Sequence, residues 1–320
     1  MGFFSLVESR LQKVDGLLSK TLRQDNALVA EVSDYLLRAG GKRLRPALVL
    51  LAGQFGSAYG TADNTLETVA AAVEMIHMAT LVHDDIIDEA VVRRGIPAVR
   101  NRYSNPVAVL AGDFLFANAF ILFAQSSKAA IVELAAQVVN VMCVGEIAQH
   151  QAQRQFSSEE DYWRRIEAKT GYFLEASCRL GALATDASEA NRDALGRYGH
   201  HIGLAYQVVD DLLDWLADPS KLGKAVGGDL AVGIYTLPII HARSQARYRQ
   251  DLDHYLLSDE VLEHMSTIKA ILDASGSLAY ARHRADRCVE DALEAARMLP
   301  EVPAREALEE LAQFIVSRDY

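Results

Sequence analysis

The sequence is poor in basic residues, cysteine and proline, and each shortage narrows the classes of protein to which it can belong. It has 32 lysines and arginines against 43 aspartates and glutamates, so its formal net charge is −11. That balance argues against a nucleic-acid partner, which would need a basic face. The three cysteines, Cys143, Cys178 and Cys288, lack metal-binding spacing, and reduced thiols in a cytoplasmic protein are their simplest interpretation.

Export signals and long uncharged apolar runs are also missing. The first residues lack the basic start and apolar run of a signal peptide, so we expect a cytoplasmic protein. The most apolar window, 107–124, is interrupted by Asp113. We find no stretch of about 18 or more residues that is both uncharged and steadily apolar, and we therefore predict no transmembrane segment.

Seven prolines and the scarcity of alternating β-branched runs favour helix nearly throughout. Ser158, followed three residues later by Asp161, is typical of a helix start. We find no linker, low-complexity tract or short repeat, and we predict a single all-α domain covering residues 1–320. Apolar residues recur with helical spacing in four long segments, 64–88, 105–124, 128–153 and 189–216.

The sequence does contain two acidic pentads with the same spacing, each after an uncharged apolar run. They are Asp84-Asp85-Ile86-Ile87-Asp88 and Asp210-Asp211-Leu212-Leu213-Asp214. On a helix, positions i, i+1 and i+4 fall within about 100° of arc, so we expect the three carboxylates of each pentad to project from one side. One pentad alone is usually a solvated helix face. Two pentads predict a site where Mg²⁺ offsets the repulsion between carboxylates and bridges them to a diphosphate.

Basic residues lie close to each pentad or to a glycine-marked break. Gly40-Gly41 allows a tight turn, after which Lys42 and Arg45 lie near enough to bind one polyanion together. Arg93 and Arg94 follow the first pentad, and arginine suits phosphate oxygens. Each feature alone is often an ordinary surface feature, but together they indicate two diphosphate sites. The remaining candidates are Lys169, Thr170, Gln207, Lys221 and Lys224.

Several of these segments together resemble the trans-isoprenyl diphosphate synthases. They are GGKRLRP, EMIHMATLVHDDIIDEAVVRRG, Lys169-Thr170, and YQVVDDLLDW followed by KLGKAVGGDL, and they extend from about residue 40 to residue 240. The resemblance implies a helical bundle of the isoprenoid synthase type around a deep central cavity. It implies head-to-tail condensation of an allylic diphosphate with isopentenyl diphosphate, with about three Mg²⁺ ions per active site. It also implies a homodimer, although some long-chain members work with a small helper subunit.

The same resemblance assigns roles to individual residues. Those implied as metal ligands or their supports are Asp84, Asp85, Asp88, Asp210, Asp211 and Asp214. Those implied to hold the allylic diphosphate are Arg93, Lys169, Thr170, Gln207 and Lys224. Those implied to hold isopentenyl diphosphate are Lys42, Arg45, His77 and Arg94, although a lone histidine on an apolar helix is more often a core residue. Those predicted to be catalytic are Asp84, Asp85, Asp88, Lys169, Asp210 and Lys224.

One departure from the family pattern affects the allylic site. Short-chain members have a second lysine where this sequence has Ile234. Binding of the allylic diphosphate is therefore expected to be weaker, or to be supplied by other residues.

Product length is predicted from the residues that precede the first pentad. The growing chain should pass Ile76, Ala79 and Thr80, about 6–12 Å from the aspartates at a rise of about 1.5 Å per residue. Aromatic residues here close the tunnel in short-chain members, whereas Ala79 and Thr80 are small. We therefore expect a product of about seven or eight isoprene units, as in the long-chain synthases that this region resembles.

Other functions stay open at this point. A neighbouring helix that blocks the tunnel would give a geranylgeranyl diphosphate synthase, and the chain could be one subunit of a heterodimeric polyprenyl synthase. A terpene cyclase is disfavoured, because it would not need a second anion site such as Lys42, Arg45 and Arg94. A structural scaffold gives no reason for aspartates beside arginines.

Overall fold

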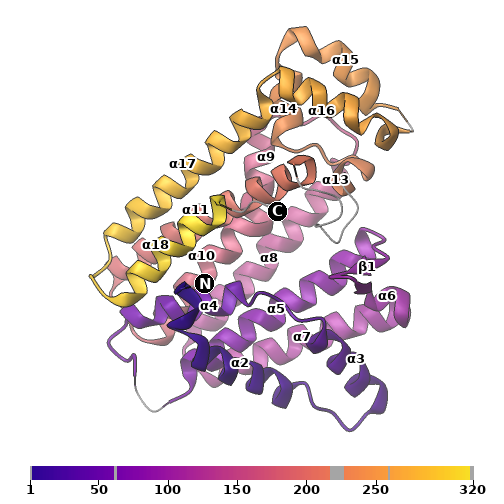
Figure 1. The fold of residues 1–320 in the computed structure, drawn as a ribbon. Helices are drawn as coiled ribbons and strands as arrows, with labels where there is room; N and C mark the ends of the chain where they lie inside the picture. The colour runs from indigo at the N-terminus through magenta and orange to yellow at the C-terminus, as the bar shows by residue number, and fades with distance from the viewer. Residues whose placement is uncertain (1, 61–62, 217–226, 259, 318–320) are drawn as a thin grey trace. The chain divides into compact units, whose positions relative to one another are not determined.

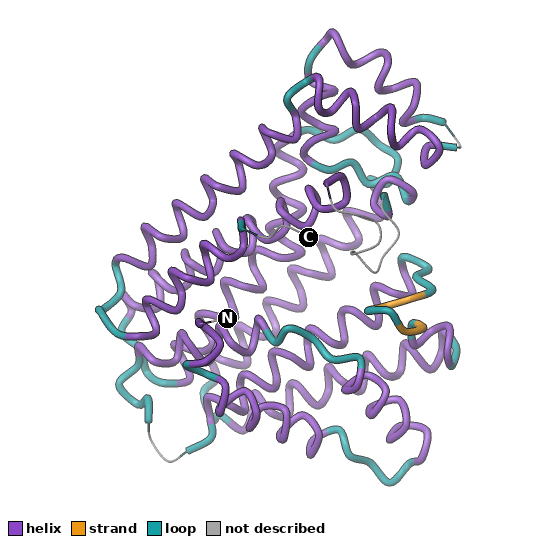
Figure 2. The backbone as a smooth tube through the Cα atoms, in the orientation of Figure 1, coloured by secondary structure: helices purple, strands orange, loops and turns teal. Residues whose placement is uncertain are grey.

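The computed structural model describes residues 2–60, 63–216, 227–258 and 260–317, and helix dominates them (Figures 1 and 2). The sheet within these ranges is a short antiparallel pair, β1 (Val92–Arg93) and β2 (Ile96–Pro97). The prediction of an all-α fold is therefore confirmed.

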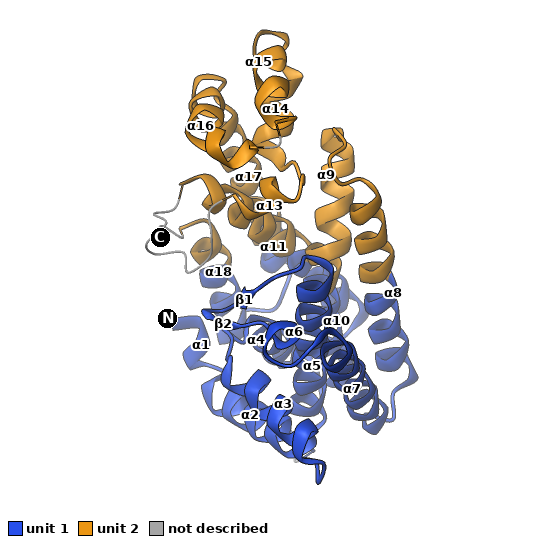
Figure 3. Cartoon of the chain, turned by 90° about the vertical axis from the view of Figure 1, so that its right-hand side faces the viewer, with its two compact units in different colours: residues 1–140, 174–199, 294–311 blue, residues 141–173, 200–293, 312–320 orange. Residues whose placement is uncertain are grey.

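The chain forms two compact units, and each is assembled from three separate segments (Figure 3). Unit 1 comprises residues 1–140, 174–199 and 294–311, and unit 2 comprises residues 141–173, 200–293 and 312–320. Because the segments alternate along the sequence, several helices begin in one unit and end in the other. The single domain over residues 1–320 stays a prediction.

Unit 1 is built around α5 (Thr65–Ile87), which packs along α7 (Asn105–Gln125), α4 (Leu44–Ala52) and α2 (Glu8–Thr21). Most of α5 is buried, since its apolar residues face several neighbours at once. The predicted helices over 64–88 and 105–124 are confirmed to within a residue at each end. The other elements that start in this unit are α1 (Gly2–Ser5), α3 (Ala27–Arg38), η1 (Gly53–Phe55), α6 (Val99–Arg102), α8 (Ala129–Gln151), α11 (Glu189–Leu216) and α18 (Pro303–Val316). The last three of these continue into unit 2.

In unit 2, α14 (Leu237–Ser244) packs on α9 (Glu159–Ile166), α15 (Ala246–Leu256) and α16 (Met265–Ala274). Helix α9 begins at a capping box formed by Ser158 and Asp161, as predicted from the sequence. The remaining elements that start in this unit are the π-helix η2 (Glu167–Gly171), α10 (Tyr172–Ala184), α13 (Gly228–Ala231), η3 (Val261–His264) and α17 (Ser277–Arg297).

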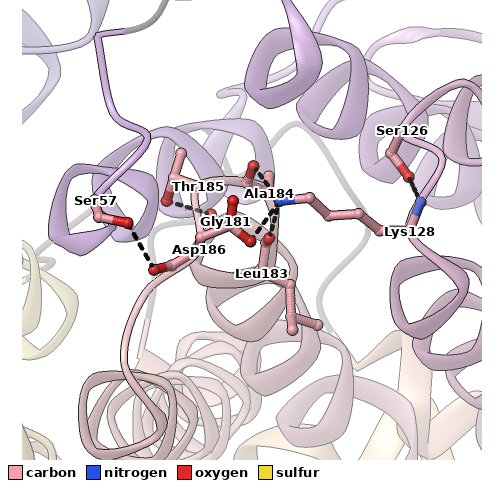
Figure 4. A network of polar contacts seen from close by, with 8 residues as sticks. All are labelled: Ser57, Ser126, Lys128, Gly181, Leu183, Ala184, Thr185 and Asp186. Atoms are coloured by element: carbon pink, nitrogen blue, oxygen red, sulfur yellow. Dashed lines mark hydrogen bonds and ion pairs between the residues drawn. The ribbon is translucent and has the colours of Figure 1, made fainter.

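The side chain of Lys128 caps the C-terminal end of α10 within unit 1 (Figure 4). Lys128 Nζ donates hydrogen bonds to the carbonyl oxygens of Leu183 (2.9 Å) and Ala184 (3.0 Å) and to Asp186 Oδ1 (2.8 Å). The last carbonyls of a helix have no partner within the helix, and a cation there also interacts favourably with the helix dipole. Because Lys128 directly precedes α8, this contact links the start of α8 to the end of α10.

Among the residues that the structure describes, three helices are long and apolar enough to cross a membrane by length and composition. They are α5, α7 and α8, and 78%, 39% and 17% of their apolar windows are buried. The apolar side chains of α5 therefore belong to the core of unit 1, whereas α7 and α8 expose much of theirs. Charges such as Asp113 interrupt these helices, and the absence of a transmembrane segment stays a prediction.

Candidate active site

The predicted site residues lie in two groups, one in each unit. We call the group in unit 1 the first half-site; it comprises Lys42, Arg45, His77, Asp84, Asp85, Asp88, Arg93 and Arg94. We call the group in unit 2 the second half-site; it comprises Lys169, Thr170, Gln207, Asp210, Asp211 and Asp214. Lys221 and Lys224 lie outside the residues that the structure describes.

The first pentad lies where α5 ends. Ile87 is the last helical residue and Asp88 is the C-cap, whose N–H donates to the Asp84 carbonyl at 2.8 Å. Asp84 and Asp88 are half-buried, but Asp85 is only 3% exposed. The three carboxylates therefore differ in exposure: the protein covers Asp85, whereas Asp84 and Asp88 are partly open to solvent.

Asp85 is held by Arg93 of strand β1. The guanidinium contacts Asp85 Oδ1 through Nε at 2.7 Å and Nη2 at 2.5 Å. Burial raises the pKa of Asp85 above its ordinary value, and the hydrogen bond from Arg93 partly opposes that shift. Arg93 thus stabilises a buried carboxylate beside the two half-buried ones.

The β1–β2 hairpin sends its two arginines to different neighbours. Arg94 (φ +52°) and Gly95 (φ +78°) both have positive φ at the tip, as a tight two-residue hairpin turn requires. Arg93 turns toward Asp85, whereas the guanidinium of Arg94 lies over Gly41: a Cβ at Gly41 would be 2.8 Å from Arg94 Nη1. Glycine at position 41 leaves the room that Arg94 occupies. Arg93 and Arg94, which are predicted to hold two different substrates, therefore have different neighbours.

His77 on α5 contacts Arg45 on α4, with 3.3 Å between His77 Nε2 and Arg45 Nη1. Burial lowers the pKa of His77 well below its ordinary value, and the positive charges of Arg45 and Arg94 lower it further. The ring is therefore neutral at neutral pH. Since arginine can only donate, Nε2 must be the accepting nitrogen and Nδ1 must carry the proton. His77 thus orients Arg45 without adding charge.

The residues predicted to set product length follow one another along α5. Ile76 and Ala79 are buried, and Thr80 is half-buried and donates its hydroxyl to the His77 carbonyl at 2.9 Å. A separate pocket, with about 420 Å³ of empty volume that includes open solvent, lies among α3, α5 and the hairpin. Its lining includes Met78, Val82 and Asp85, so apolar and charged groups meet beside the first pentad.

In the second half-site, Lys169 and Thr170 lie within the π-helix that joins α9 to α10. A π-turn is rare and is often found at functional sites. Lys169 Nζ is 3.1 Å from Glu146 Oε1 of α8, which also accepts a hydrogen bond from Gln149 at 3.0 Å. Glu146 was not predicted as a site residue, because a single glutamate on a long apolar helix does not indicate which residue it contacts.

A chain of hydrogen bonds joins the π-helix to the second pentad. Thr170 Oγ1 donates to Gln207 Oε1 at 2.8 Å, and Gln207 Nε2 donates to Asp211 Oδ1 at 2.9 Å. The hydroxyl of the buried Tyr162 donates to Asp211 Oδ2 at 2.8 Å. Tyr162 was also missed; the predicted helix start at Ser158 places it on α9 but does not indicate what it contacts. Both carboxylate oxygens of Asp211 are therefore engaged by the protein.

Asp211 is a strongly perturbed acid. It is 4% exposed, and burial, together with the negative charge of Asp229, raises its pKa to about 8. The hydrogen bonds from Gln207 and Tyr162 act in the opposite direction. These bonds favour the ionised form, so the pKa of Asp211 would be higher still without them.

Two glycines let the π-helix approach α11 closely. A Cβ at Gly203 would be 2.6 Å from Gly171 Cα and 3.1 Å from the Thr170 carbonyl oxygen. Real Cβ atoms do not come so close to backbone. Gly203 lies one helical turn before Gln207, so this approach brings the π-helix within hydrogen-bonding range of Gln207.

The other two aspartates of the second pentad differ from Asp211 in their exposure and their neighbours. Asp210 is half-buried and Asp214 is 9% exposed. Asp214 lines a small pocket together with Asp229 and Ile234, the residue that stands in place of a family lysine. An apolar side chain therefore occupies this place beside two carboxylates.

The two pentads share one arrangement. In each, the first aspartate is half-buried, while the second is buried, hydrogen-bonded to protein donors and raised in pKa. Carboxylate oxygens are the donors that a hard cation such as Mg²⁺ prefers, so the residues present fit such an ion. Within the described ranges, no group of three or more histidine, cysteine, aspartate or glutamate side chains is already gathered for a metal ion. Each half-site thus offers a few carboxylates, as Mg²⁺ ligation with water and phosphate oxygens requires.

Comparison with known proteins identifies the class. The sequence model described as "Polyprenyl synthetase" matches residues 26–274, and the chain belongs to this family. It is 33% identical over 320 residues to heptaprenyl diphosphate synthase component 2 of Bacillus subtilis, covering 99% of this chain and 90% of that one. It is 34% identical over 309 residues to the octaprenyl diphosphate synthase of Escherichia coli, covering 96% and 95%.

The fold agrees with this assignment. A crystal structure of a polyprenyl synthase from Caulobacter crescentus, complexed with calcium and isoprenyl diphosphate, matches with a TM-score of 0.91 and 34% identity. The match covers 99% of this chain and 97% of that one. The resemblance first seen in the motifs is therefore confirmed over the whole chain.

The setting of His77 predicts a pH dependence of stability. Because its pKa is lowered in the folded chain, the unfolded chain binds the proton more readily, and the free energy of unfolding should fall as the pH drops below about 6.5. His77→Gln keeps an acceptor for Arg45 and removes the titration. Thermal unfolding of both proteins between about pH 7.5 and 5.5 should show a smaller loss in the variant. Parallel curves would contradict the prediction.

Proposed function

We propose that this protein is a prenyltransferase that condenses an allylic diphosphate with successive isopentenyl diphosphates, head to tail, into a long-chain all-trans polyprenyl diphosphate. The observation that carries the proposal is that each half-site combines half-buried aspartates with basic side chains held by protein acceptors. The curated relatives named above are heptaprenyl and octaprenyl enzymes, which agrees with a long product. We place the protein in the cytoplasm.

The predicted site residues keep their roles in this proposal. Mg²⁺ would be held by Asp84, Asp85 and Asp88 in the first half-site and by Asp210 in the second, with Asp211 and Asp214 in support; about three ions per active site are proposed. Arg93, Lys169, Thr170, Gln207 and Lys224 would hold the allylic diphosphate, and Lys42, Arg45, His77 and Arg94 the isopentenyl diphosphate. The calcium and isoprenyl diphosphate in the Caulobacter protein are consistent with such a site.

The proposed mechanism is electrostatic. Breaking the allylic C–O bond leaves a carbocation and a diphosphate with several negative charges, and bound Mg²⁺ would neutralise part of that charge. Arg93 and Lys169 would hold the leaving diphosphate, while Lys42, Arg45 and Arg94 position the isopentenyl double bond for attack on the cation. A proton is then lost to the released diphosphate, so no side chain needs to act as a base. Apolar walls would keep water from the cation.

The first test is incubation with Mg²⁺, farnesyl diphosphate and labelled isopentenyl diphosphate, followed by chromatographic sizing of the product. We expect a ladder that ends at about seven or eight isoprene units, and chelation of the metal should abolish it. Asp84→Asn should lower turnover by about a hundredfold or more, because it removes a ligand of the Mg²⁺ that would stabilise the leaving diphosphate. Asp25→Asn, at an exposed aspartate outside both half-sites, is the control.

The outcomes of this assay separate the alternatives. A ladder that stops at four units would favour a geranylgeranyl diphosphate synthase. A folded wild-type protein that makes no product alone would favour a subunit of a heterodimeric synthase, as the name "component 2" of the Bacillus relative suggests for that protein. Full activity in Asp84→Asn would overturn the proposed role of the first pentad.

Product length should respond to Ala79. This residue is fully buried on α5, and a tyrosine there would fill the proposed tunnel, so Ala79→Tyr should shorten the product. Ala71→Tyr, two helical turns farther from the pentad and equally buried, tests whether overpacking alone has this effect. An unchanged ladder in a folded Ala79→Tyr protein would show that the growing chain runs elsewhere.

We also propose a homodimer formed through α7. This helix is apolar, yet only 39% of its apolar window is buried; Leu110 is 67% exposed and Ile121 56%. Exposed apolar surface of this kind marks an interaction site. A second copy is the proposed occupant, and a small helper subunit is the alternative.

Light scattering of the purified chain should give about twice the mass of one chain. Leu110→Asp should shift the protein toward monomer, because a charge would enter an apolar interface. Leu257→Asp alters a residue that is similarly exposed, at 64%, but lies next to α15, and should leave the mass unchanged. A monomeric wild-type protein with full activity would refute the homodimer.

A further inference from the structure

We infer that Arg43 is a positioning residue for the isopentenyl diphosphate site: a clamp formed by Glu74 and Asp15 holds its side chain and thereby sets the directions of Lys42 and Arg45. The inference rests on the proposed function, since it concerns how that site is built. Arg43 lies between the two proposed ligands in the sequence, yet its own contacts are to protein carboxylates.

The backbone at Arg43 is unusual. It has φ +51° and ψ +33°, in the left-handed region, and it is the residue before α4. A residue with a side chain adopts this conformation at a cost, which is why glycine usually occupies such positions. Strained residues of this kind persist only where the surroundings fix them. The contacts of the Arg43 side chain supply that fixation.

Arg43 is fixed at two points by different helices. Its Nη1 lies 2.7 Å from Glu74 Oε1 of α5, and its Nε lies 2.9 Å from Asp15 Oδ1 of α2. The side chain of Glu74 is only 2% exposed, that of Arg43 15% and that of Asp15 53%. Burial alone would lower the pKa of Arg43, but Glu74 and Asp15 outweigh it and raise the pKa above the ordinary value. The guanidinium is therefore a charged bridge between α2 and α5.

The same face of α5 also orients Arg45. His77 lies three residues after Glu74, so the two side chains are neighbours on the helix surface. Glu74 holds Arg43, and His77 Nε2 lies 3.3 Å from Arg45 Nη1. Contacts from α5 thus fix the side chains of both arginines at the start of α4.

The clamp also neutralises one of the positive charges in the turn. Lys42, Arg43 and Arg45 place three cations within four residues, and they repel one another unless anions lie nearby. Two protein carboxylates neutralise Arg43, whereas neutral His77 leaves the charge of Arg45 in place. Of the three cations, Arg43 is thus the one that Glu74 and Asp15 hold.

The decisive experiment compares two double variants of the whole protein. Arg43→Asn/Glu74→Gln removes the clamp without leaving an unpaired buried charge, and asparagine tolerates the left-handed backbone better than other residues with a side chain. The matched control is Arg10→Asn/Glu67→Gln. Glu67 is another 2% exposed glutamate on α5, paired with Arg10 at 2.9 Å, and it lies two turns before Glu74.

The readout is calorimetric binding of isopentenyl diphosphate alone, which cannot react without an allylic partner. We expect the Kd of the Arg43→Asn/Glu74→Gln protein to rise about tenfold, or about 1.4 kcal/mol, while the control stays within about twofold of wild type. The KM for the allylic substrate should be unchanged in both. Both variants should melt earlier than wild type, since each loses a buried ion pair.

An unchanged Kd in the clamp variant, or an equal loss in the control, would overturn the inference. A wild-type protein that does not bind isopentenyl diphosphate would instead overturn the proposed function. If the double variant does not fold, Asp15→Asn removes the exposed arm of the clamp and should raise the Kd by about two- to threefold, as expected for a partly exposed pair. No change in that folded variant would count against the clamp.

Discussion

The burial of carboxylates on α5 is the constraint on which the first half-site depends. An apolar helix at the centre of unit 1 carries three acidic side chains that are 2–3% exposed, and a buried charge must be paired with another charge to be tolerated. Each is paired with an arginine from a different segment, so the charges fix where those segments lie against α5. The three pairs are Glu67 with Arg10 of α2, Glu74 with Arg43 before α4, and Asp85 with Arg93 of β1.

The second half-site meets a similar constraint with hydrogen bonds in place of an ion pair. Asp211 is buried on α11, and its partners are the neutral side chains of Tyr162 and Gln207. Each bond has a defined direction, because the Tyr162 hydroxyl and the Gln207 amide nitrogen donate to the oxygens of Asp211. The amide of Gln207 is therefore oriented, and so is the hydroxyl of Thr170 that donates to it. One buried acid thus orders three side chains from α9, η2 and α11.

Periodic and spaced features could be predicted from the sequence, and long-range contacts could not. Local patterns in the sequence predict helices α5 and α11, the helix start at Ser158 and the family. The burial of Asp85 and Asp211 does not, because it depends on Arg93 and Tyr162, whose positions are set by tertiary packing. The roles proposed for the site residues remain predictions.

The π-turn at Glu167–Gly171 has a consequence for how the chain tolerates change in length. Residues eight apart on an ideal α-helix turn through about 800°, which leaves them roughly 80° out of line. Widening the helix by one π-turn reduces that offset, so Tyr162 and Thr170 both reach α11, at Asp211 and Gln207 one turn apart. Deleting one residue between Tyr162 and Thr170 would leave them seven positions apart, and on a regular α-helix that spacing is about 700°, which again puts the two hydroxyls nearly in line. The π-turn thus accommodates one extra residue between Tyr162 and Thr170 while both hydroxyls still reach α11.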